Sequence, residues 1–252
     1  MSPSRTDFLL AIEGLTVSFD GFKAVDDLNL YIDRGEIRVI IGPNGAGKTT
    51  VLDLICGRTR ATAGSIRFKD RELTQLREHE IVRAGVGRKF QTPSVYDDLT
   101  VFENLEISYP RGRGVFGALA FDRDTAVVER VGEIAEMIFL ADYIDKRAEF
   151  LSHGQRQWLE IGMLLIQDPE LLMLDEPVAG MSVSEREKTA ELLNRIIGES
   201  RDRSLIVIEH DMKFVENIAK YVTVLHQGKI LAEGNMAAVQ ANPKVVEVYL
   251  GH

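Results

Sequence analysis

Among the apolar runs of the chain, three are four or five residues long and have the character of buried strands. They occupy residues 37–41, 171–174 and 205–208. Short runs of this kind are typical of parallel strands that are covered on both faces. They therefore predict buried strands in the interior of an α/β fold.

Other stretches alternate between apolar and polar residues and predict strands with one exposed face. The alternation covers residues 28–32 and returns over residues 65–68. Near the end of the chain, residues 221–226 and 229–232 flank Gln227-Gly228 and predict a β-hairpin. The chain before residue 69 thus consists mainly of strands.

The segment from residue 91 to residue 150 has a different pattern. Val131, Ile134 and Ile138 recur at helical spacing, and no buried-strand run interrupts the segment. This pattern predicts a helical subdomain inserted into the sheet domain. A further short helix is expected over residues 243–250.

Two longer helices are predicted from capping boxes, in which a serine is followed three residues later by Glu or Gln. Ser152-x-x-Gln155 opens an amphipathic stretch that stops near Pro169, and Ser184-x-x-Glu187 opens another. The second helix is expected to run through Ile197, with Gly198 as its stop.

Composition narrows the class of protein. With 252 residues, 45% hydrophobic and 27% charged, the chain fits one large α/β domain or a domain with a sub-lobe. The net charge of −9 disfavours nucleic acid as a partner, because an acidic surface repels phosphate backbones. The single cysteine, Cys56, is expected to be a small buried hydrophobe.

No apolar run has the length needed to span a bilayer, and Phe8–Ile12 is too short for the core of a signal peptide. We therefore expect a cytoplasmic protein that is peripheral on the inner face of the cell membrane. Contact with the membrane would require other proteins.

Gly42–Thr49 matches the complete phosphate-loop pattern G-x-x-x-x-G-K-[ST], between a predicted strand and a predicted helix. Glycines let successive backbone N–H groups face an anion, and the helix N-terminus adds its positive end. Lys48 is predicted to reach the β- and γ-phosphates, and Thr49 to ligate Mg²⁺. The expected nucleotide-binding residues are Gly42, Pro43, Asn44, Gly45, Ala46, Gly47, Lys48, Thr49 and Thr50.

Asp175 and Glu176 follow the apolar run 171–174 directly. Phosphoryl transfer requires charge on the metal ion and an oriented nucleophile. Asp175 is therefore predicted as a second Mg²⁺ position beside Thr49, and Glu176 as the group that polarises the attacking water.

The segment Leu151-Ser152-His153-Gly154-Gln155 resembles the L-S-G-G-Q signature of ATP-binding cassette (ABC) ATPases. Other motifs of that family are also present, in the order along the chain that the family has. Gln91 resembles the Q-loop glutamine, and His210, after the apolar run 205–208, resembles the switch histidine. Phe19 lies where the family places an aromatic residue on adenine, although the nearby Phe22 could also stack.

The resemblance implies an α/β fold, that of a P-loop NTPase with a RecA-like core, an N-terminal antiparallel β subdomain and an inserted α-helical subdomain. The chain would be a single ABC ATPase domain over residues 1–252. Residues 1–90 and 151–252 would form the nucleotide-binding core lobe, and residues 91–150 the helical subdomain.

The resemblance also implies ATP and Mg²⁺ as cofactors, and catalytic roles for Glu176, His210, Gln91 and Lys48. Gln91 would also approach the metal, with Thr49 and Asp175. Ser152, Gly154 and Gln155 would serve the ATP that a second ABC ATPase subunit holds, in a homodimer or a heterodimer. The alternative left open by the residues alone is that Ser152 merely caps its helix.

Two positions depart from the family pattern. His153 stands where glycine is usual, and its side chain narrows the space beside the phosphate. Ser182 stands where many cassette ATPases carry aspartate, which puts the link between subunits in doubt at that position.

The chain most resembles ATPases of the branched-chain amino acid uptake family, through 177–181, 209–212 and the Tyr109–Gly114 segment. Within that family, residues 151–155 and 157–164 are most similar to the ATP-binding subunits of urea transporters. The expected partners are transmembrane permease subunits and a periplasmic or extracellular solute-binding protein. The expected function is powering the uptake of urea, with branched-chain amino acid import as the alternative.

A soluble ABC ATPase that acts on ribosomes or DNA is an alternative from another class. Such proteins usually carry two cassettes, long coiled coils or basic faces, none of which this acidic chain shows. A P-loop protein without turnover is disfavoured because Lys48, Asp175, Glu176 and His210 are all present.

Overall fold

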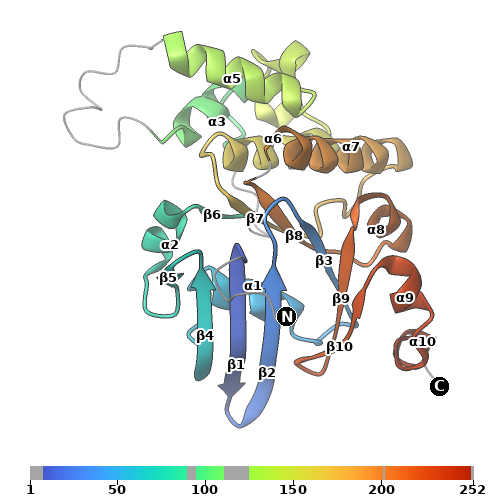
Figure 1. Cartoon of the computed structure of the whole chain (residues 1–252). Helices are drawn as coiled ribbons and strands as arrows, with labels where there is room; N and C mark the ends of the chain where they lie inside the picture. Colours follow the sequence, from blue (N-terminus) through green and yellow to red (C-terminus); the bar gives the residue numbers. More distant parts are fainter. Residues whose placement is uncertain (1–7, 90–94, 111–124, 201, 251–252) are drawn as a thin grey trace. The chain divides into compact units, whose positions relative to one another are not determined.

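A computed structural model describes residues 8–89, 95–110, 125–200 and 202–250 (Figure 1). The chain forms two compact units. The first contains residues 1–88, 170–177 and 193–252, and the second contains residues 89–169 and 178–192. The second unit thus extends beyond the range 91–150 that the sequence suggested for a helical subdomain.

The first unit carries a small antiparallel sheet with the strand order β2-β1-β4-β5. Strands β1 (Leu10–Phe19) and β2 (Phe22–Ile32) form a hairpin, and β4 (Ala63–Phe68) and β5 (Arg71–Glu72) extend the sheet. Burial alternates over residues 28–32, with Leu28, Leu30 and Ile32 inside, which confirms the half-exposed strand.

A six-stranded sheet has the order β10-β9-β3-β8-β7-β6 (Figure 1). Its strands are β3 (Ile37–Ile41), β6 (Val86–Lys89), β7 (Leu171–Asp175), β8 (Ser204–Ile208), β9 (Tyr221–His226) and β10 (Lys229–Gly234). Strand β3 pairs in parallel with β8 and β9, and β7 pairs in parallel with β8. Every residue of β3, β7 and β8 is buried, as the continuous apolar runs predict.

The late hairpin is also confirmed, because β9 and β10 pair antiparallel around a turn. Gln227 and Gly228 both have positive φ, at 50° and 76°. Two successive left-handed residues are the geometry that suits the twist of a two-residue hairpin turn.

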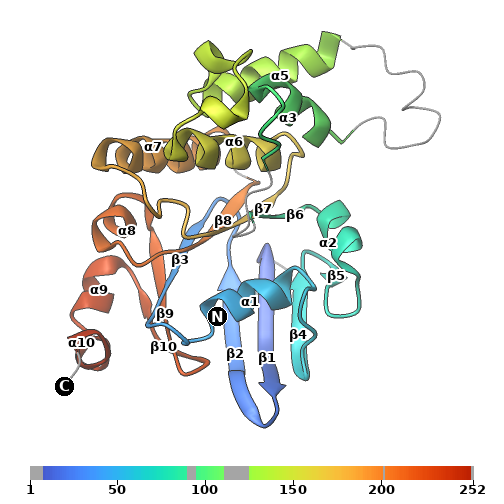
Figure 2. The same ribbon diagram turned by 180° about the vertical axis from the view of Figure 1, so that it is seen from behind.

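Five helices complete the described part of the first unit: α1 (Lys48–Ile55), α2 (Glu78–Ala84), α8 (Met212–Ile218), α9 (Met236–Gln240) and α10 (Pro243–Leu250). Helix α1 is labelled in Figure 2. It buries Val51, Leu52, Leu54 and Ile55. These side chains share one buried cluster with residues of both sheets, including Leu10 and Ile206. The apolar face of α1 therefore joins the two sheets of this unit.

The second unit contains α3 (Val101–Ser108), α5 (Thr125–Met137), α6 (His153–Leu165) and the start of α7 (Val183–Glu199). Short 3₁₀ turns lie at Ala141–Tyr143 and Ala148–Phe150. Val131, Ile134 and Ile138 are buried, as their helical spacing predicts.

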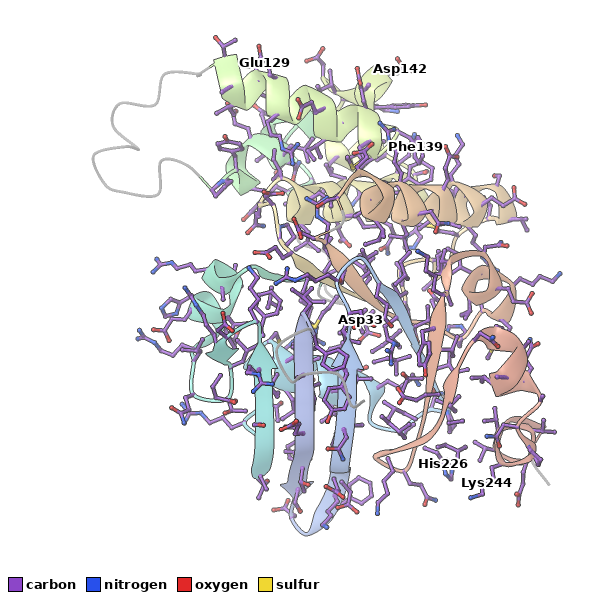
Figure 3. All side chains as sticks on the ribbon, in the orientation of Figure 1. Asp33, Glu129, Phe139, Asp142, His226 and Lys244 are labelled. Carbon is purple, nitrogen blue, oxygen red and sulfur yellow. The ribbon has the colours of Figure 1, made fainter. Side chains whose placement is uncertain are left out.

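Aromatic packing and two polar contacts tie this unit together. The Phe139 ring, labelled in Figure 3, packs edge-on against Trp158 with 5.5 Å between ring centroids. Trp158 Nε1 donates to Thr189 Oγ1 at 2.9 Å, which joins α6 to α7. Lys89 Nζ lies 3.2 Å from a carboxylate oxygen of Glu160, and both side chains are buried.

Helix α6 begins as the sequence predicts, with Ser152 and Gln155 forming the capping box, but it ends at Leu165 rather than near Pro169. The capping box predicted for α7 is wrong. Ser182 and Glu185 exchange the capping hydrogen bonds, so the helix begins at Val183, two residues before the predicted start.

The end of α7 also differs from the prediction. The helix runs to Glu199 and contains Gly198, which is absent from the set of glycines with positive φ. A glycine stops a helix when it adopts the left-handed conformation, and Gly198 does not.

Two glycines of the second unit allow a matched test of its packing. A Cβ atom added at Gly162 would lie 2.5 Å from Ile138 Cδ1, whereas a Cβ added at Gly132 meets nothing within 4 Å. We expect Gly162→Ala to lower the free energy of unfolding by about 1–3 kcal/mol through overpacking. Gly132→Ala should raise it by up to about 1 kcal/mol through helix propensity.

Urea denaturation of both full-length variants measures the difference. Equal midpoints for the two variants would contradict the close packing of α6 against Ile138.

Candidate functional site

The predicted phosphate loop connects β3 to α1, and its first and last glycines are required sterically. A Cβ atom at Gly42 would lie 2.2 Å from the carbonyl oxygen of Leu225. At Gly47, with φ of 100°, it would lie 2.5 Å from that of Ala24. Both neighbours are backbone atoms, so no side-chain rearrangement could relieve these contacts. The loop is therefore held against the backbone of other strands.

The turn of the late hairpin supports the same loop. Gly228 N donates to Ala46 O at 3.0 Å, and Asp26 N donates to Gly228 O at 2.9 Å. Lys229 Nζ lies 2.9 Å from a carboxylate oxygen of Asp26. Residues close to the end of the chain thus fix the position of the loop and of β2.

Lys48 is the cation of this loop. Its Nζ donates to the carbonyl oxygens of Gly42 at 2.7 Å and Pro43 at 3.1 Å. Burial lowers the pKa of the Lys48 amine, and the nearby carboxylates of Glu176 and Asp175 raise it in part. A partly desolvated ammonium that donates to two carbonyl oxygens would be stabilised by an anion placed in the loop.

Thr49 and Asp175 are brought together as the sequence predicts. Thr49 Oγ1 donates to Asp175 Oδ2 at 3.1 Å, and Asp175 is 4% exposed. Burial raises the pKa of the Asp175 carboxyl, while the Thr49 hydrogen bond lowers it. A hydroxyl and one carboxylate fit Mg²⁺, which usually takes few protein ligands and completes its octahedron with water and phosphate oxygens.

Glu176 and His210 lie at neighbouring strand ends. The register between β7 and β8 sets Asp175 opposite Ile208, and Glu176 N donates to Ile208 O at 3.0 Å. The backbone of Glu176 is left-handed, with φ of 49°, which is uncommon outside glycine. His210 Nδ1 lies 3.5 Å from Glu176 Oε1, and both side chains are open to solvent.

Phe19 and Phe22 end β1 and begin β2, and they are partners in the strand register. Their rings are 50% and 67% exposed, respectively. Exposed aromatic rings of this size are available for stacking on a base, and both candidates for the adenine contact remain.

The signature-like segment lies in the second unit. Gln155 N donates to Ser152 Oγ at 3.2 Å, and Ser152 N donates to Gln155 Oε1 at 2.9 Å. His153 Nε2 lies 3.0 Å from Ala179 O, so this ring connects the start of α6 to the loop before α7. Gly154 is buried beneath Glu185, whose carboxylate leaves no room for a Cβ atom.

The predicted site residues therefore form two groups. The first unit brings the phosphate loop together with Asp175, Glu176 and His210. The second unit places Ser152, Gly154 and Gln155 at the N-terminus of α6. Gln91, predicted as a metal and catalytic residue, lies outside the described residues.

The sequence did not indicate the roles of two charged residues in these regions, Arg88 and Glu185. Arg88 NH1 donates to Asp53 Oδ1 at 2.6 Å and lies 3.2 Å from the buried Cys56 Sγ, which fixes β6 to α1. The available signal for the Arg88 contact was a single charged residue, Asp53, among the apolar residues of its helix. For the contact of Glu185 with Ser152 and Gly154 the sequence offered no signal, because only the fold brings these residues together.

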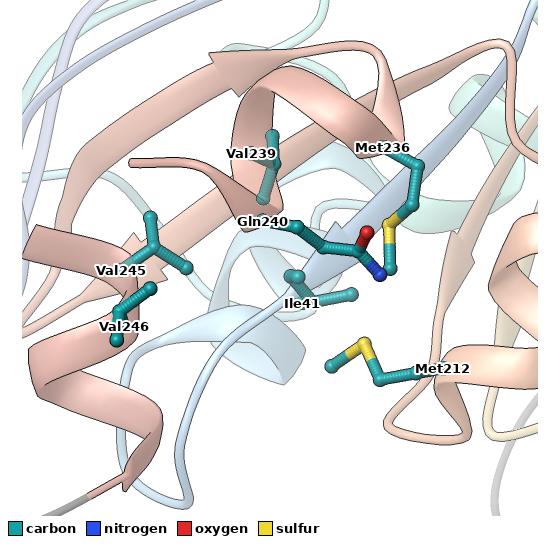
Figure 4. A pocket seen from close by; sticks show the side chains of 7 residues that line it. All are labelled: Ile41, Met212, Met236, Val239, Gln240, Val245 and Val246. Carbon is teal, nitrogen blue, oxygen red and sulfur yellow. The ribbon is translucent and has the colours of Figure 1, made fainter. Parts of the chain in front are cut away.

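A cavity of about 240 Å³ lies elsewhere in the first unit, where Ile41, Met212 and Met236 point toward one another (Figure 4). Its other lining residues are valines and Gln240. The cavity lacks the cations and backbone N–H groups that a triphosphate needs, so it is not the nucleotide site.

Among the residues that the structure describes, no helix is both long enough and apolar enough to cross a bilayer.

Comparisons with known proteins agree with this geometry. The sequence profile of the family described as "ABC transporter" matches residues 25–179. That of the family described as "Branched-chain amino acid ATP-binding cassette transporter" matches residues 229–252.

Two curated relatives match almost the whole chain. The high-affinity branched-chain amino acid transport ATP-binding protein BraF of Pseudomonas aeruginosa is 35% identical, covering 96% of this chain and 98% of the relative. LivG of Escherichia coli, which has the same description, is 36% identical with the same coverage.

Solved structures match equally well. The ADP conformation of an ATP-binding cassette of an ABC transporter superimposes with a TM-score of 0.85 at 31% identity. The match covers 97% of this chain and 99% of that one. A nucleotide-free ATP-binding cassette gives the same TM-score at 30% identity, covering 97% and 100%.

Asp175→Asn tests the metal position. The amide keeps the shape of the side chain but removes the charge, so we expect about tenfold more Mg²⁺ to be needed for half-maximal ATP hydrolysis. Burial raises the pKa of Asp175, so its charged form is less favourable in the folded chain than in the unfolded chain. The thermal stability of the variant at pH 7 should therefore be no lower than that of the parent chain.

Titration of Mg²⁺ at saturating ATP measures the first effect, and calorimetry measures the second. An unchanged Mg²⁺ requirement would remove Asp175 from the metal site.

Proposed function

The chain belongs to the ABC transporter family as an ATP-hydrolysing subunit, and from that premise we propose that it powers the import of a small solute through membrane partners. The observation that carries the proposal is the arrangement of Lys48, Thr49, Asp175, Glu176 and His210 around one phosphate loop. These side chains supply the groups that phosphoryl transfer from ATP to water requires.

Each of these residues has a distinct chemical task. The Lys48 ammonium and the loop N–H groups hold the β- and γ-phosphates in place. Thr49 and Asp175 would hold Mg²⁺, which neutralises charge on the phosphates as the bond breaks. Glu176 accepts the proton of the attacking water, and His210 holds the γ-phosphate from the neighbouring strand end.

The signature-like segment, residues 151–155, would contribute to the ATP site of a second subunit. Ser152, with the N-terminus of α6 and the small Gly154, offers a second position for an anion. In the proposed mechanism two ATPase subunits associate head to tail, and each signature segment completes the site of its partner. Gln91 would pass this closure to a membrane subunit.

The solute is proposed from two independent sources. BraF and LivG are described as branched-chain amino acid transport ATP-binding proteins, and the family that matches residues 229–252 is described as a branched-chain amino acid ATP-binding cassette transporter. Branched-chain amino acids are therefore the better supported solutes. Urea is the second candidate, because residues 151–155 and 157–164 are similar to those of urea-transporter ATPases.

The remaining parts of the proposal follow from this role. The chain would work at the cytoplasmic face of the cell membrane beside transmembrane permease subunits. A solute-binding protein on the other side of the membrane would select the solute, because selection requires contact with the solute. In this role the present chain would contact ATP and the partner subunits instead.

Glu176→Gln tests the general base. The amide cannot accept the proton of water, so we expect ATP turnover to fall by about 10²–10⁴-fold. ATP binding should be retained and the bound form should be dimeric, since the phosphate loop is unchanged. Turnover is measured by phosphate release and association by light scattering; undiminished turnover would exclude Glu176 as the base.

Uptake experiments identify the solute. With Glu176→Gln in place of the native chain, cells of the source organism are given labelled leucine or labelled urea. Loss of leucine uptake alone is the expected result and supports branched-chain amino acid import. Loss of urea uptake alone would assign urea instead, and retention of both would contradict the proposed solutes.

A further inference from the structure

Glu185, in the first turn of α7, contacts two separate elements of the second unit. Its Oε2 accepts hydrogen bonds from Ser182 N at 2.9 Å and Ser182 Oγ at 2.7 Å. Its Oε1 accepts a hydrogen bond from Ser152 Oγ at 3.3 Å. One oxygen therefore caps α7, while the other engages the serine of the signature-like segment.

The same carboxylate lies directly against the start of α6. A Cβ atom added at Gly154 would be 2.3 Å from Glu185 Oε1 and 2.6 Å from its carboxyl carbon. Gly154 thus allows an anionic side chain to reach the helix N-terminus, a position where negative charge is favourable. Glu185 thus accepts a hydrogen bond from the same hydroxyl that a phosphate would engage in the proposed function.

Glu185 carries its negative charge at neutral pH. The backbone amide and then the hydroxyl of Ser182 lower the pKa of this carboxyl, with smaller contributions from Ser152 and His153. His153 lies beside Ser152 and is engaged with Ala179 O through Nε2.

A phosphate and Glu185 would compete for one proton donor. The Ser152 hydroxyl has a single hydrogen to donate, and here it points to the carboxylate. A phosphate at the same hydroxyl would displace that hydrogen bond, and its charge would repel the carboxylate at short range. Binding of the phosphate must therefore overcome both the loss of this hydrogen bond and the repulsion by the carboxylate.

We propose that Glu185 is a positioning residue that holds the Ser152 hydroxyl until a phosphate displaces it, and so sets the ATP concentration at which two subunits associate. The inference rests on the proposed function, in which Ser152 serves the ATP of the partner subunit. It assigns to Glu185 a role beyond capping α7.

The test uses full-length chains that carry Glu176→Gln, so that ATP is bound and not consumed. Glu185→Gln removes the charge but keeps the side-chain shape, and glutamine also serves in capping boxes. We expect the ATP concentration for half-maximal dimerisation, followed by light scattering, to fall about fivefold, because a charge-assisted hydrogen bond becomes a neutral one.

Two variants serve as controls in the same background. Glu187→Gln removes a charge from an exposed side chain two residues further along α7, and it should leave the half-maximal ATP concentration unchanged. Ser182→Ala weakens the cap of α7 and retains the Glu185 charge. It should lower the melting temperature without lowering the ATP requirement.

The outcomes separate the two proposals. An unchanged or raised ATP requirement in Glu185→Gln, or an equal decrease in Glu187→Gln, would overturn the role of Glu185 and leave the proposed function intact. A lack of any ATP-dependent association in the Glu176→Gln parent would overturn the shared-site mechanism and this inference with it.

Discussion

The parallel register of β3, β7 and β8 decides where the charged groups of the candidate site in the first unit can lie. Ile40 and Asp175 both pair with Ile208, so three strands end at the same level. The candidate site lies at these strand ends: the phosphate loop, Asp175, Glu176 and His210. These groups come together because the three strands end side by side. A slip of one residue in β7 would turn Asp175 to the other face of the sheet and separate it from Thr49.

In the site that results, two charged side chains are electrostatically unfavourable because of their burial. Burial lowers the pKa of the Lys48 amine and raises that of the Asp175 carboxyl, which means that each charge loses more hydration than its partners restore. In the proposed function, Mg²⁺ and a triphosphate would supply the missing opposite charges. Binding of nucleotide and stability of the first unit are therefore linked, since each ligand relieves a cost that the folded chain otherwise carries.

The sequence predicted the parts of the fold that depend on local patterns. Buried runs became β3, β7 and β8, and the turn residues Gln227-Gly228 became a hairpin. The start of α7 was misplaced because Ser182 and Ser184 are each followed by glutamate at the third position. Both satisfy the same local rule, so only the tertiary structure selects between them.

The candidate site shows the same division between local and long-range information. The motifs locate Lys48, Thr49 and Asp175 at a loop or a strand end, and the structure brings Thr49 to Asp175. Their roles toward nucleotide and metal stay predictions. Glu185 and Arg88 matter through neighbours 33 and 35 positions away, Ser152 and Asp53. A single sequence does not identify the partners in such contacts, since the packing of helices and strands chooses them.

The contacts of Gly228 have a consequence for how the protein is made. The phosphate loop lies early in the chain, yet it is hydrogen-bonded to Gly228 and packed against Leu225. A ribosome must therefore synthesise the chain past Gly228, and release β9 and the following turn from its exit tunnel, before the loop can take its final shape. A growing chain that already contains every residue of the phosphate loop still lacks the native shape of that loop until Gly228 has been made, so native nucleotide binding depends on residues far along the sequence.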